Sequence, residues 1–274
     1  MQMTFIGHVS KDINKTLRAT TIAPGGGVYY GSIAASRLGA TCSVITKCAE
    51  EDKTLFAEMT QAVAAVFFKS SQRTTTIENL YPSDNPDDRI SRVLSLADSF
   101  SLDDILRIES QIFVISALWH GEIPEDLLPI LRKGCDLLAL DAQGFLRNID
   151  SNGQMVYSKW DRLDLLKLVD VFKVDSKEAF VLTGHKDRLT ACQKIKELGV
   201  KIVLLTHNQG VCAYDGKNFY EAKFAPYKLE GRTGRGDTCL ASFLASFDQP
   251  LDVAVKISAE VTSKKMQYPG PYKG

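Results

Sequence analysis

The chain has 274 residues, enough for one large α/β domain or two small ones with a sizeable buried core. Its 33 acidic and 33 basic side chains cancel, so composition favours neither a nucleic acid nor an anionic membrane as partner. No apolar run reaches the roughly 18 residues of a membrane span, and the N-terminus lacks the pattern of a signal peptide. The six cysteines lie mostly in apolar runs, which is typical of reduced thiols in a cytoplasmic protein.

The N-terminal quarter of the chain predicts alternating strands and helices. Residues 4–8 form the first expected strand, and the polar, alternating segment 11–22 indicates exposed β structure. Pro24-Gly25-Gly26-Gly27 then opens a helix of small residues over 28–38. The following elements complete a β-α-β unit: a strand over 42–46, a helix near 52–60 and a strand over 63–68.

The segment 72–96 interrupts this rhythm. Residues 73–81 predict a strand with polar faces, 82–88 a turn-rich loop and 89–96 a returning strand. A polar hairpin fits poorly inside a parallel core. We therefore expect it to project as a small sheet that pairs with 11–22.

The C-terminal half returns to alternating strands and helices. Strands are expected over 112–116, 136–141, 169–174 and 201–206, with helices over 124–132, 176–182 and 189–198. A hairpin over 211–222 and two final helices, starting at Thr238 and Asp252, complete the chain. This order predicts a single α/β domain over 1–274: a doubly covered, mostly parallel central sheet with a small projecting β lid formed by segments 11–22 and 72–96.

A glycine-rich turn over 231–236 precedes Asp237 and a buried helix. Such a turn directs several backbone N–H groups to one point, and the helix dipole adds positive potential there, which suits a phosphate group. Asp237 stands where a nucleotide-binding P-loop would carry lysine. It could accept a proton from a substrate hydroxyl, or only cap the helix. The local sequence leaves both readings open.

Polar side chains end several predicted strands of the parallel sheet. They are Asp141, Asp175 with Glu178 in the following turn, and Thr206. Ligands of such sheets bind at the carboxyl ends of the strands. Together with the glycine-rich turn, these residues predict one crevice that is lined by carboxylates and suited to Mg-nucleotide chemistry.

From Gly7 to Pro271 the chain resembles the ribokinase-like (PfkB-type) carbohydrate kinases. The most specific match is the signature Asp-Thr-x-Gly-Ala-Gly-Asp, which residues 231–237 occupy here. The resemblance implies that Asp237 is the catalytic base. It also implies an anion hole formed by the N–H groups at Gly234, Arg235, Gly236 and Asp237.

The resemblance assigns further roles along the chain. The implied substrate-binding residues are Asp12, Gly25, Gly26 and Tyr30, and Arg89 on the returning strand of the lid is a further candidate for binding substrate. The implied nucleotide-binding residues are Thr206, Gly210, Thr233 and Asp175, and Glu178 would hold Mg²⁺ through water. Each of three residues also has a possible non-functional role: Asp12 as an exposed turn residue, Arg89 as a structural residue, and Glu178 as a solvated helix residue. The pair Lys264-Lys265 predicts a solvated helix face.

Departures from the family pattern bear on the ligands. Tyr30 replaces a substrate-binding Asn and Gly27 a Lys of ribokinases, which argues against a ribose pocket. Gly231 replaces an Asp that helps to bind a monovalent cation in some members, which puts cation activation in doubt. Arg235 replaces the usual Ala of the anion hole, and either contacts a phosphate or substrate carboxylate or points to solvent.

The predicted activity is ATP- and Mg²⁺-dependent phosphorylation of a hydroxyl on a sugar or cyclitol. The segments 119–122, 141–144 and 231–239 resemble those of the myo-inositol kinase subgroup. Kinases for a nucleoside or a keto-sugar acid, and a non-catalytic nucleotide or sugar sensor, are the alternatives. The polar edge of the expected lid could pair two copies of the chain as a homodimer.

Overall fold

The computed structural model describes residues 1–83, 90–106 and 108–274, so the prediction for Arg89 lies outside the described residues. Nine strands form a central sheet, parallel from β13 to β5, with β14 antiparallel to both of its neighbours. In spatial order they are β15 (Phe219–Lys223), β14 (Gly210–Tyr214), β13 (Ile202–His207), β12 (Val171–Asp175), β9 (Cys135–Asp141), β8 (Ser110–Ile115), β1 (Gln2–Ile6), β4 (Thr41–Cys48) and β5 (Ala65–Ser70).

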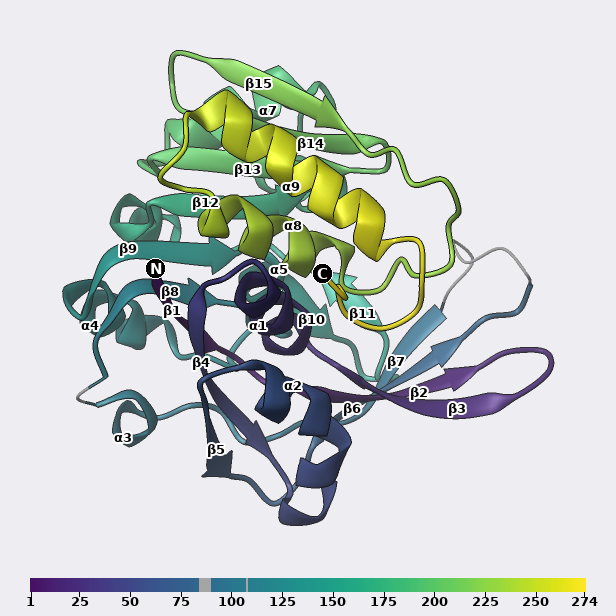
Figure 1. Ribbon diagram of the computed structural model, residues 1–274. Helices are drawn as coiled ribbons and strands as arrows, with labels where there is room; N and C mark the ends of the chain where they lie inside the picture. Colours follow the sequence, from purple (N-terminus) through teal and green to yellow (C-terminus); the bar gives the residue numbers. More distant parts are fainter. Residues whose placement is uncertain (84–89, 107) are drawn as a thin grey trace.

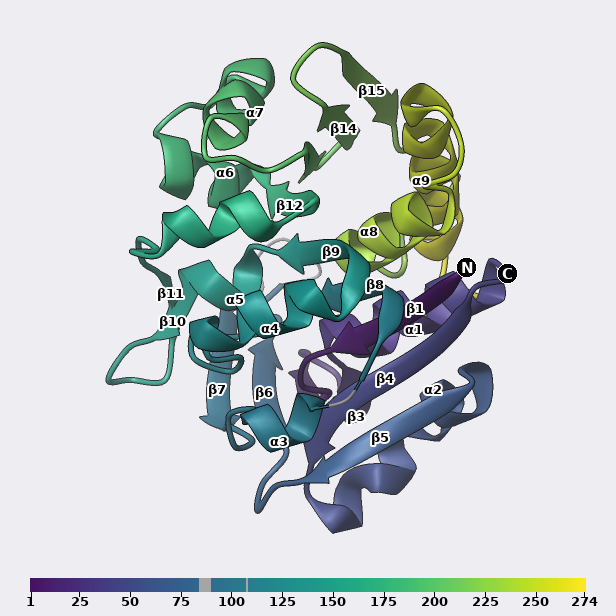
Figure 2. The same ribbon diagram turned by 90° about the vertical axis from the view of Figure 1, so that its left-hand side faces the viewer.

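Helices cover both faces of this sheet (Figures 1 and 2). One layer holds α1 (Gly27–Arg37), α2 (Ala57–Ala62), α8 (Arg235–Ala245) and α9 (Leu251–Lys265). The other holds α3 (Leu102–Ile105), α4 (Leu128–Lys133), α5 (Gln143–Leu146), α6 (Ser176–Thr183) and α7 (Arg188–Lys196). Successive strand residues point to opposite faces, so Phe5 and Ile6 of β1 enter different cores. The predicted doubly covered, mostly parallel α/β fold is confirmed.

Several short elements differ from the prediction. The helix expected near 52–60 is a 3₁₀ helix, η1 (Glu50–Phe56), that continues into α2. A two-stranded hairpin was not expected, nor were two further 3₁₀ helices; these are β10 (Arg147–Ile149), β11 (Met155–Tyr157), η3 (Glu125–Leu127) and η4 (Leu163–Leu168). Elements of three to seven residues span too few turns or alternations to leave a periodic signal in the sequence.

A second, four-stranded sheet projects from one end of the central sheet (Figure 1). We call it the small sheet; its order is β3 (Thr20–Gly25), β2 (Ser10–Lys15), β6 (Thr75–Leu80) and β7 (Ile90–Ser95). The expected pairing of the two predicted segments is confirmed, because β2 runs parallel to β6. One face of the small sheet is buried at Ser10, Asp12 and Asn79, whereas Ile22 is exposed.

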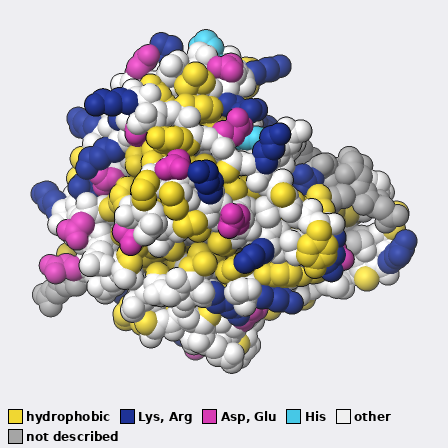
Figure 3. Space-filling model, turned by 45° about the horizontal axis from the view of Figure 1, so that its top comes forward, with side chains coloured by type: hydrophobic (Ala, Val, Ile, Leu, Met, Phe, Trp, Pro, Cys, Tyr) yellow, Lys and Arg dark blue, Asp and Glu magenta, His cyan; other side chains and the backbone are white. Residues whose placement is uncertain are grey.

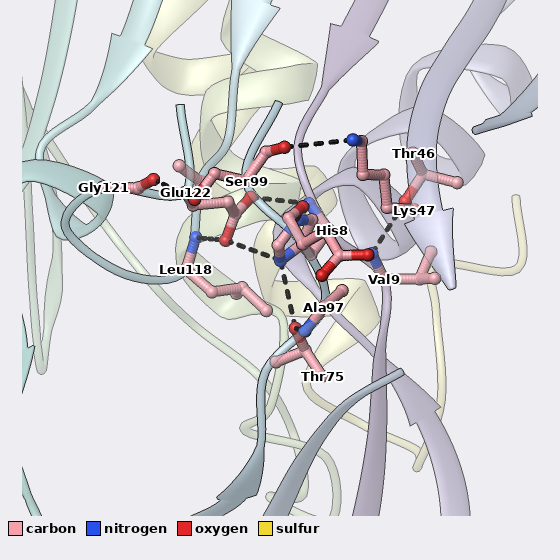
Figure 4. A network of polar contacts seen from close by, with 12 residues as sticks. His8, Val9, Thr46, Lys47, Thr75, Ala97, Ser99, Leu118, Gly121 and Glu122 are labelled. Carbon is pink, nitrogen blue, oxygen red and sulfur yellow. Dashed lines mark hydrogen bonds and ion pairs between the residues drawn. The ribbon is translucent and has the colours of Figure 1, made fainter. Parts of the chain in front are cut away.

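A buried polar network joins the small sheet to the central sheet (Figure 4). The Glu122 carboxyl group accepts hydrogen bonds from the backbone N–H groups of His8 at 2.6 Å and Leu118 at 2.8 Å. Because the Asp98 carbonyl can only accept, His8 Nε2 carries hydrogen, and Nδ1 accepts from the Thr75 hydroxyl at 3.0 Å. Burial raises the pKa of Glu122 to about 8 and lowers that of His8 to about 4. We call these four residues, His8, Thr75, Leu118 and Glu122, the junction network.

The surface is mixed in charge on the face drawn in Figure 3, where acidic and basic side chains are interspersed around apolar ones. This agrees with the balanced composition and gives that face no dominant sign of charge. Among the described helices, none combines the length and the apolar character that a membrane crossing requires.

Candidate active site

The glycine-rich turn leads directly into α8. Gly234 has φ 80° and is the residue before the first helical one, and a Cβ there would overlap the Tyr30 ring. Only glycine meets both conditions at low cost. The helix begins at Arg235, three residues before the predicted start, so the first-turn N–H groups and the positive end of the helix dipole lie at the turn.

Asp237 is half-buried in the first turn of α8. It is the third helical residue, and Gly234 holds the cap position, so the helix-cap reading of Asp237 is wrong. A Cβ on Gly27 would lie 2.8 Å from Asp237 Oδ1, so the missing side chain leaves that carboxylate its space. Burial and the nearby charge of Asp141 raise the pKa of Asp237, while Lys173 acts against them.

A buried cluster of opposite charges lies beside the turn. Lys173 Nζ lies 2.9 Å from Asp141 Oδ2 and 3.8 Å from Glu178 Oε2. Arg147 Nη2 lies 3.5 Å from Glu178 Oε1. A Cβ on Gly236 would be 3.0 Å from Lys173 Nζ, which puts this ammonium next to the glycine-rich turn. We call Asp141, Arg147, Lys173 and Glu178 the charge cluster.

The electrostatics of this cluster are balanced internally. Burial disfavours the Lys173 ammonium, but the carboxylates, Asp141 first, outweigh it and raise the pKa of Lys173. Burial raises the pKa of Glu178 to about 7, against the effect of Lys173. Glu178 is fully buried, so the alternative prediction that it is exposed to solvent is wrong. Its carboxylate accepts from the Asp175 N–H at 2.7 Å, while Asp175 Oδ1 accepts from the Glu178 N–H at 2.8 Å.

Lys173 and Arg147 were not among the site residues predicted from the sequence. Lys173 is the only charged residue inside the otherwise apolar part of β12, before Asp175 ends the strand. A single charged side chain within a buried parallel strand costs stability. Its presence in the sequence could therefore have marked Lys173 as a functional residue. Arg147 follows the short helix α5 and had no comparable signal.

Three of the predicted substrate-binding residues, Asp12, Gly25 and Gly26, lie at or beside the small sheet, and Tyr30 lies in α1. Asp12 is buried and accepts from Ser10 Oγ at 2.7 Å, so its exposed-turn reading is wrong. A Cβ on Gly25 would lie 2.6 Å from Asp12 Oδ2. Gly26 has φ 102°, and its own Cβ would lie 2.6 Å from the His8 carbonyl oxygen. Burial raises the pKa of Tyr30, and the charges of Asp12 and Asp237 raise it further.

The three consecutive glycines link the two carboxylates. Asp12 lies against Gly25 and Asp237 lies against Gly27. Two residues of extended chain span at most about 7 Å, so Asp12 and Asp237 lie against opposite ends of a short stretch of backbone.

The predicted nucleotide-binding residues are more dispersed. Thr206 is buried, and Gly210 is required by packing, because a Cβ there would overlap the Ala222 carbonyl oxygen. Neither lines the pocket beside the turn, and neither does the half-buried Thr233. That pocket, of about 340 Å³, is lined by basic, amide and apolar side chains that include Lys223, Arg232, Arg235, Asn208 and Phe224. Within the described ranges its lining contains no acidic side chain.

Comparison with known proteins shows that the chain is similar to carbohydrate kinases. A model of the pfkB family carbohydrate kinases matches residues 3–274. A solved pyrophosphate-dependent kinase in the ribokinase family, in complex with sulfate, is 48% identical; the match covers 99% of this chain and 97% of that one, with a TM-score of 0.93. A second such structure, complexed with a pyrophosphate analog and myo-inositol, is 47% identical with the same coverage and TM-score. A cytidine kinase of Thermococcus kodakarensis is 26% identical over 278 residues, or 95% of this chain and 94% of its own length.

Proposed function

The chain belongs to the pfkB family of carbohydrate kinases and is a phosphotransferase that acts on an alcohol group, and from this premise we propose that it phosphorylates a hydroxyl of myo-inositol or a similar cyclitol with inorganic pyrophosphate as donor. ATP, the donor expected from the sequence, is the second candidate. The observation that carries the proposal is the short glycine run, which lies against Asp12 at Gly25 and against Asp237 at Gly27.

The buried face of the small sheet supports a polyol acceptor. Asn79 Nδ2 donates to Asn14 Oδ1 at 3.2 Å, and Ser91 Oγ donates to Asn79 Oδ1 at 2.7 Å. Asn14, Asn79 and Ser91 are cross-strand neighbours, and Ser10 and Asp12 lie on the same face further along β2. Hydroxyl, amide and carboxylate groups in one row match the alternating donors and acceptors of a ring of hydroxyls.

The basic pocket beside the turn supports a pyrophosphate donor. Lys223, Arg232 and Arg235 line it, and the Arg235 guanidinium lies 5.9 Å from the centre of the Phe224 ring. One arginine guanidinium group can donate two parallel hydrogen bonds to two oxygens of a phosphate group. These side chains therefore suit a compact, highly charged anion. The two pyrophosphate-dependent structures that match nearly the whole chain favour the same donor.

The proposed reaction is a direct displacement. Asp237 accepts the proton of the attacking hydroxyl as its oxygen bonds to the near phosphorus of pyrophosphate. The bridging P–O bond breaks, and phosphate leaves toward the basic pocket. The N–H groups at Gly234, Arg235 and Gly236, with the Lys173 ammonium, stabilise the charge on the transferring group.

The acidic side chains of the site bear on how Mg²⁺ would bind. Within the described ranges, no group of three or more His, Cys, Asp or Glu side chains is arranged to hold a metal ion. The Asp141 and Glu178 carboxylates are paired with Lys173 and Arg147. This arrangement suits Mg²⁺ carried by the donor phosphates, with Asp175 and Glu178 acting through water. When bound, Mg²⁺ would neutralise donor charge.

The sequence predictions of a single domain with a lid, and of a homodimer through that lid, remain proposals. The outer face of the small sheet supports the dimer, because Ile22, Leu80, Ile90 and Leu94 are exposed on it. Sedimentation equilibrium of the wild type and of Ile22→Lys tests it. A monomeric wild type would contradict the dimer.

A panel of donors and acceptors tests the function. We would follow transfer from pyrophosphate or ATP, with Mg²⁺, to myo-inositol and its isomers, ribose, cytidine and keto-gluconate by phosphorus NMR. Transfer from pyrophosphate to myo-inositol is the expected result. Transfer from ATP to cytidine would replace it with the nucleoside kinase reading, and binding without transfer would support a sensor.

A further inference from the structure

One lysine of the last helix lies in an unexpected place. The pair Lys264-Lys265 was predicted to face solvent, and Lys264 does so, but Lys265 is 0% exposed. The prediction is therefore wrong for Lys265. An ammonium group taken out of water is costly, so a buried lysine needs partners that repay the loss of hydration.

The partners of Lys265 all belong to the active-site turn or its support. Its Nζ donates to the Gly231 carbonyl oxygen at 2.7 Å, and lies 5.4 Å from the centre of the Tyr30 ring. The same ring packs against Gly234, where a Cβ would overlap it. Lys265 thus contacts the first residue of the turn directly and Gly234 through the ring.

The turn is shaped to receive this side chain. A Cβ on Gly231 would lie 3.2 Å from Lys265 Nζ and would overlap the Tyr268 carbonyl oxygen. The Gly231 N–H donates to the Met266 carbonyl at 3.0 Å. The end of α9 therefore holds the start of the turn through both backbone and ammonium.

Lys265 also interacts with the charge of the active-site carboxylate. Burial lowers the pKa of Lys265 to about 8, and the negative charge of Asp237 acts against this effect. Asp237 of α8 is the charged group that acts on the ammonium, and Tyr30 of α1 is the other titratable neighbour. Strands β14 and β15 also pack on α9, but no charged side chain in their described residues acts on the Lys265 ammonium.

We propose that Lys265 is a positioning residue for phosphoryl transfer, a fixed internal cation that holds the glycine-rich turn in its anion-binding shape and favours the charged form of Asp237. The inference rests on the proposed function. It assigns to α9 a part in the reaction although Lys265 touches no reacting atom. Because the ammonium loses its proton as pH rises through about 8, turnover should decline there.

The test compares Lys265→Met, which keeps length and removes charge, with Lys264→Met on the exposed neighbouring position as the matched control. We expect Lys265→Met to lower kcat about tenfold or more, with a smaller change in KM for the acceptor. Lys264→Met should keep the wild-type values. The decline of wild-type kcat above pH 8 should also be absent in Lys265→Met. Wild-type kcat in Lys265→Met, or the same alkaline decline in both proteins, would overturn the proposal.

Two controls keep the test decisive. If Lys265→Met does not fold, as judged by circular dichroism, the wild-type pH profile decides, and constant turnover between pH 7 and 9.5 overturns the proposal. If the wild type transfers no phosphoryl group, the proposed function fails separately. Calorimetry with inorganic pyrophosphate then tests Lys265, because weaker binding at pH 9.5 than at pH 7 supports the proposal and equal binding overturns it.

Discussion

Two buried polar regions of this molecule are built in opposite ways. In the junction network, both carboxyl oxygens of Glu122 accept N–H groups and both ring nitrogens of His8 have partners (Figure 4). In the charge cluster, groups of opposite sign lie together, and Arg147 Nε has no hydrogen-bond partner in the described part of the chain. The first region is complete by itself, whereas the second is not.

The difference indicates what each region is for. A buried polar network with every partner in place stabilises one arrangement of the elements that it joins. An incompletely paired cluster costs stability and is expected where a ligand completes it. We therefore expect substitutions in the charge cluster and the turn to lower activity, and those in the junction network to lower stability.

The largest effect should come from Asp237→Asn. Loss of the base should lower kcat about 10²–10⁴-fold, because the hydroxyl proton has no acceptor of similar basicity. Pyrophosphate binding, measured by calorimetry, should change little. Glu122→Gln makes the same change in the junction network and should keep kcat near the wild-type value. Equal losses in both variants would remove the distinction between the regions.

Two buried lysines allow the next comparison. Lys173→Met should lower kcat about 100-fold, because it removes a cation beside the transferring group. Lys47 lies next to the junction network, where its Nζ is 2.9 Å from Asp104 Oδ2 and 3.0 Å from the Ser99 carbonyl oxygen. Lys47→Met should cost about 3 kcal/mol of unfolding free energy and leave kcat largely unchanged. Denaturant unfolding and steady-state kinetics measure both; a large kcat loss in Lys47→Met would contradict the assignment.

The contribution of Glu122 to the free energy of unfolding should depend on pH. Its pKa is raised in the folded state from 4.5 to about 8, so its contribution to stability is present at low pH and is lost as pH rises toward 8. Between pH 6.5 and 8, where the unfolded-state carboxyl is already ionised, we expect a loss of about 2 kcal/mol. Glu122→Gln should lack this decline. The measurement is the difference in unfolding free energy between the two proteins at each pH, and a constant difference would refute the expectation.

The smallest effect should come from Thr75→Val. The hydroxyl donates to His8 Nδ1 and accepts from the Ala97 N–H at 3.1 Å. Its loss should cost about 1 kcal/mol of unfolding free energy, without a change in kcat. Ser10 lies beside Asp12 on the buried face of the small sheet, where the acceptor is proposed to bind. Ser10→Ala should therefore raise the KM for the acceptor and leave the unfolding free energy nearly constant. Identical effects of the two changes would show that the small sheet acts as one unit.

Local sequence patterns were enough to predict most of the fold. Alternating apolar strands and helices indicated the doubly covered sheet, and the polar segment 72–96 indicated a second sheet. The patterns were weakest for short elements such as β10 and β11. The patterns also failed to show which charged residues are buried. A charged residue on a helix is normally exposed, and its burial depends on neighbours that are distant in the sequence.

The sequence by itself determined the order of the elements, the glycine-rich turn and the position of Asp237 at the start of a helix. These follow from backbone preferences that operate within a few residues. Only the tertiary structure decided that Tyr30 packs on Gly234, that Lys173 lies beside Gly236 and that Lys265 is buried at Gly231. Each of these contacts joins different elements of the chain, so packing of whole elements, and not local propensity, creates them.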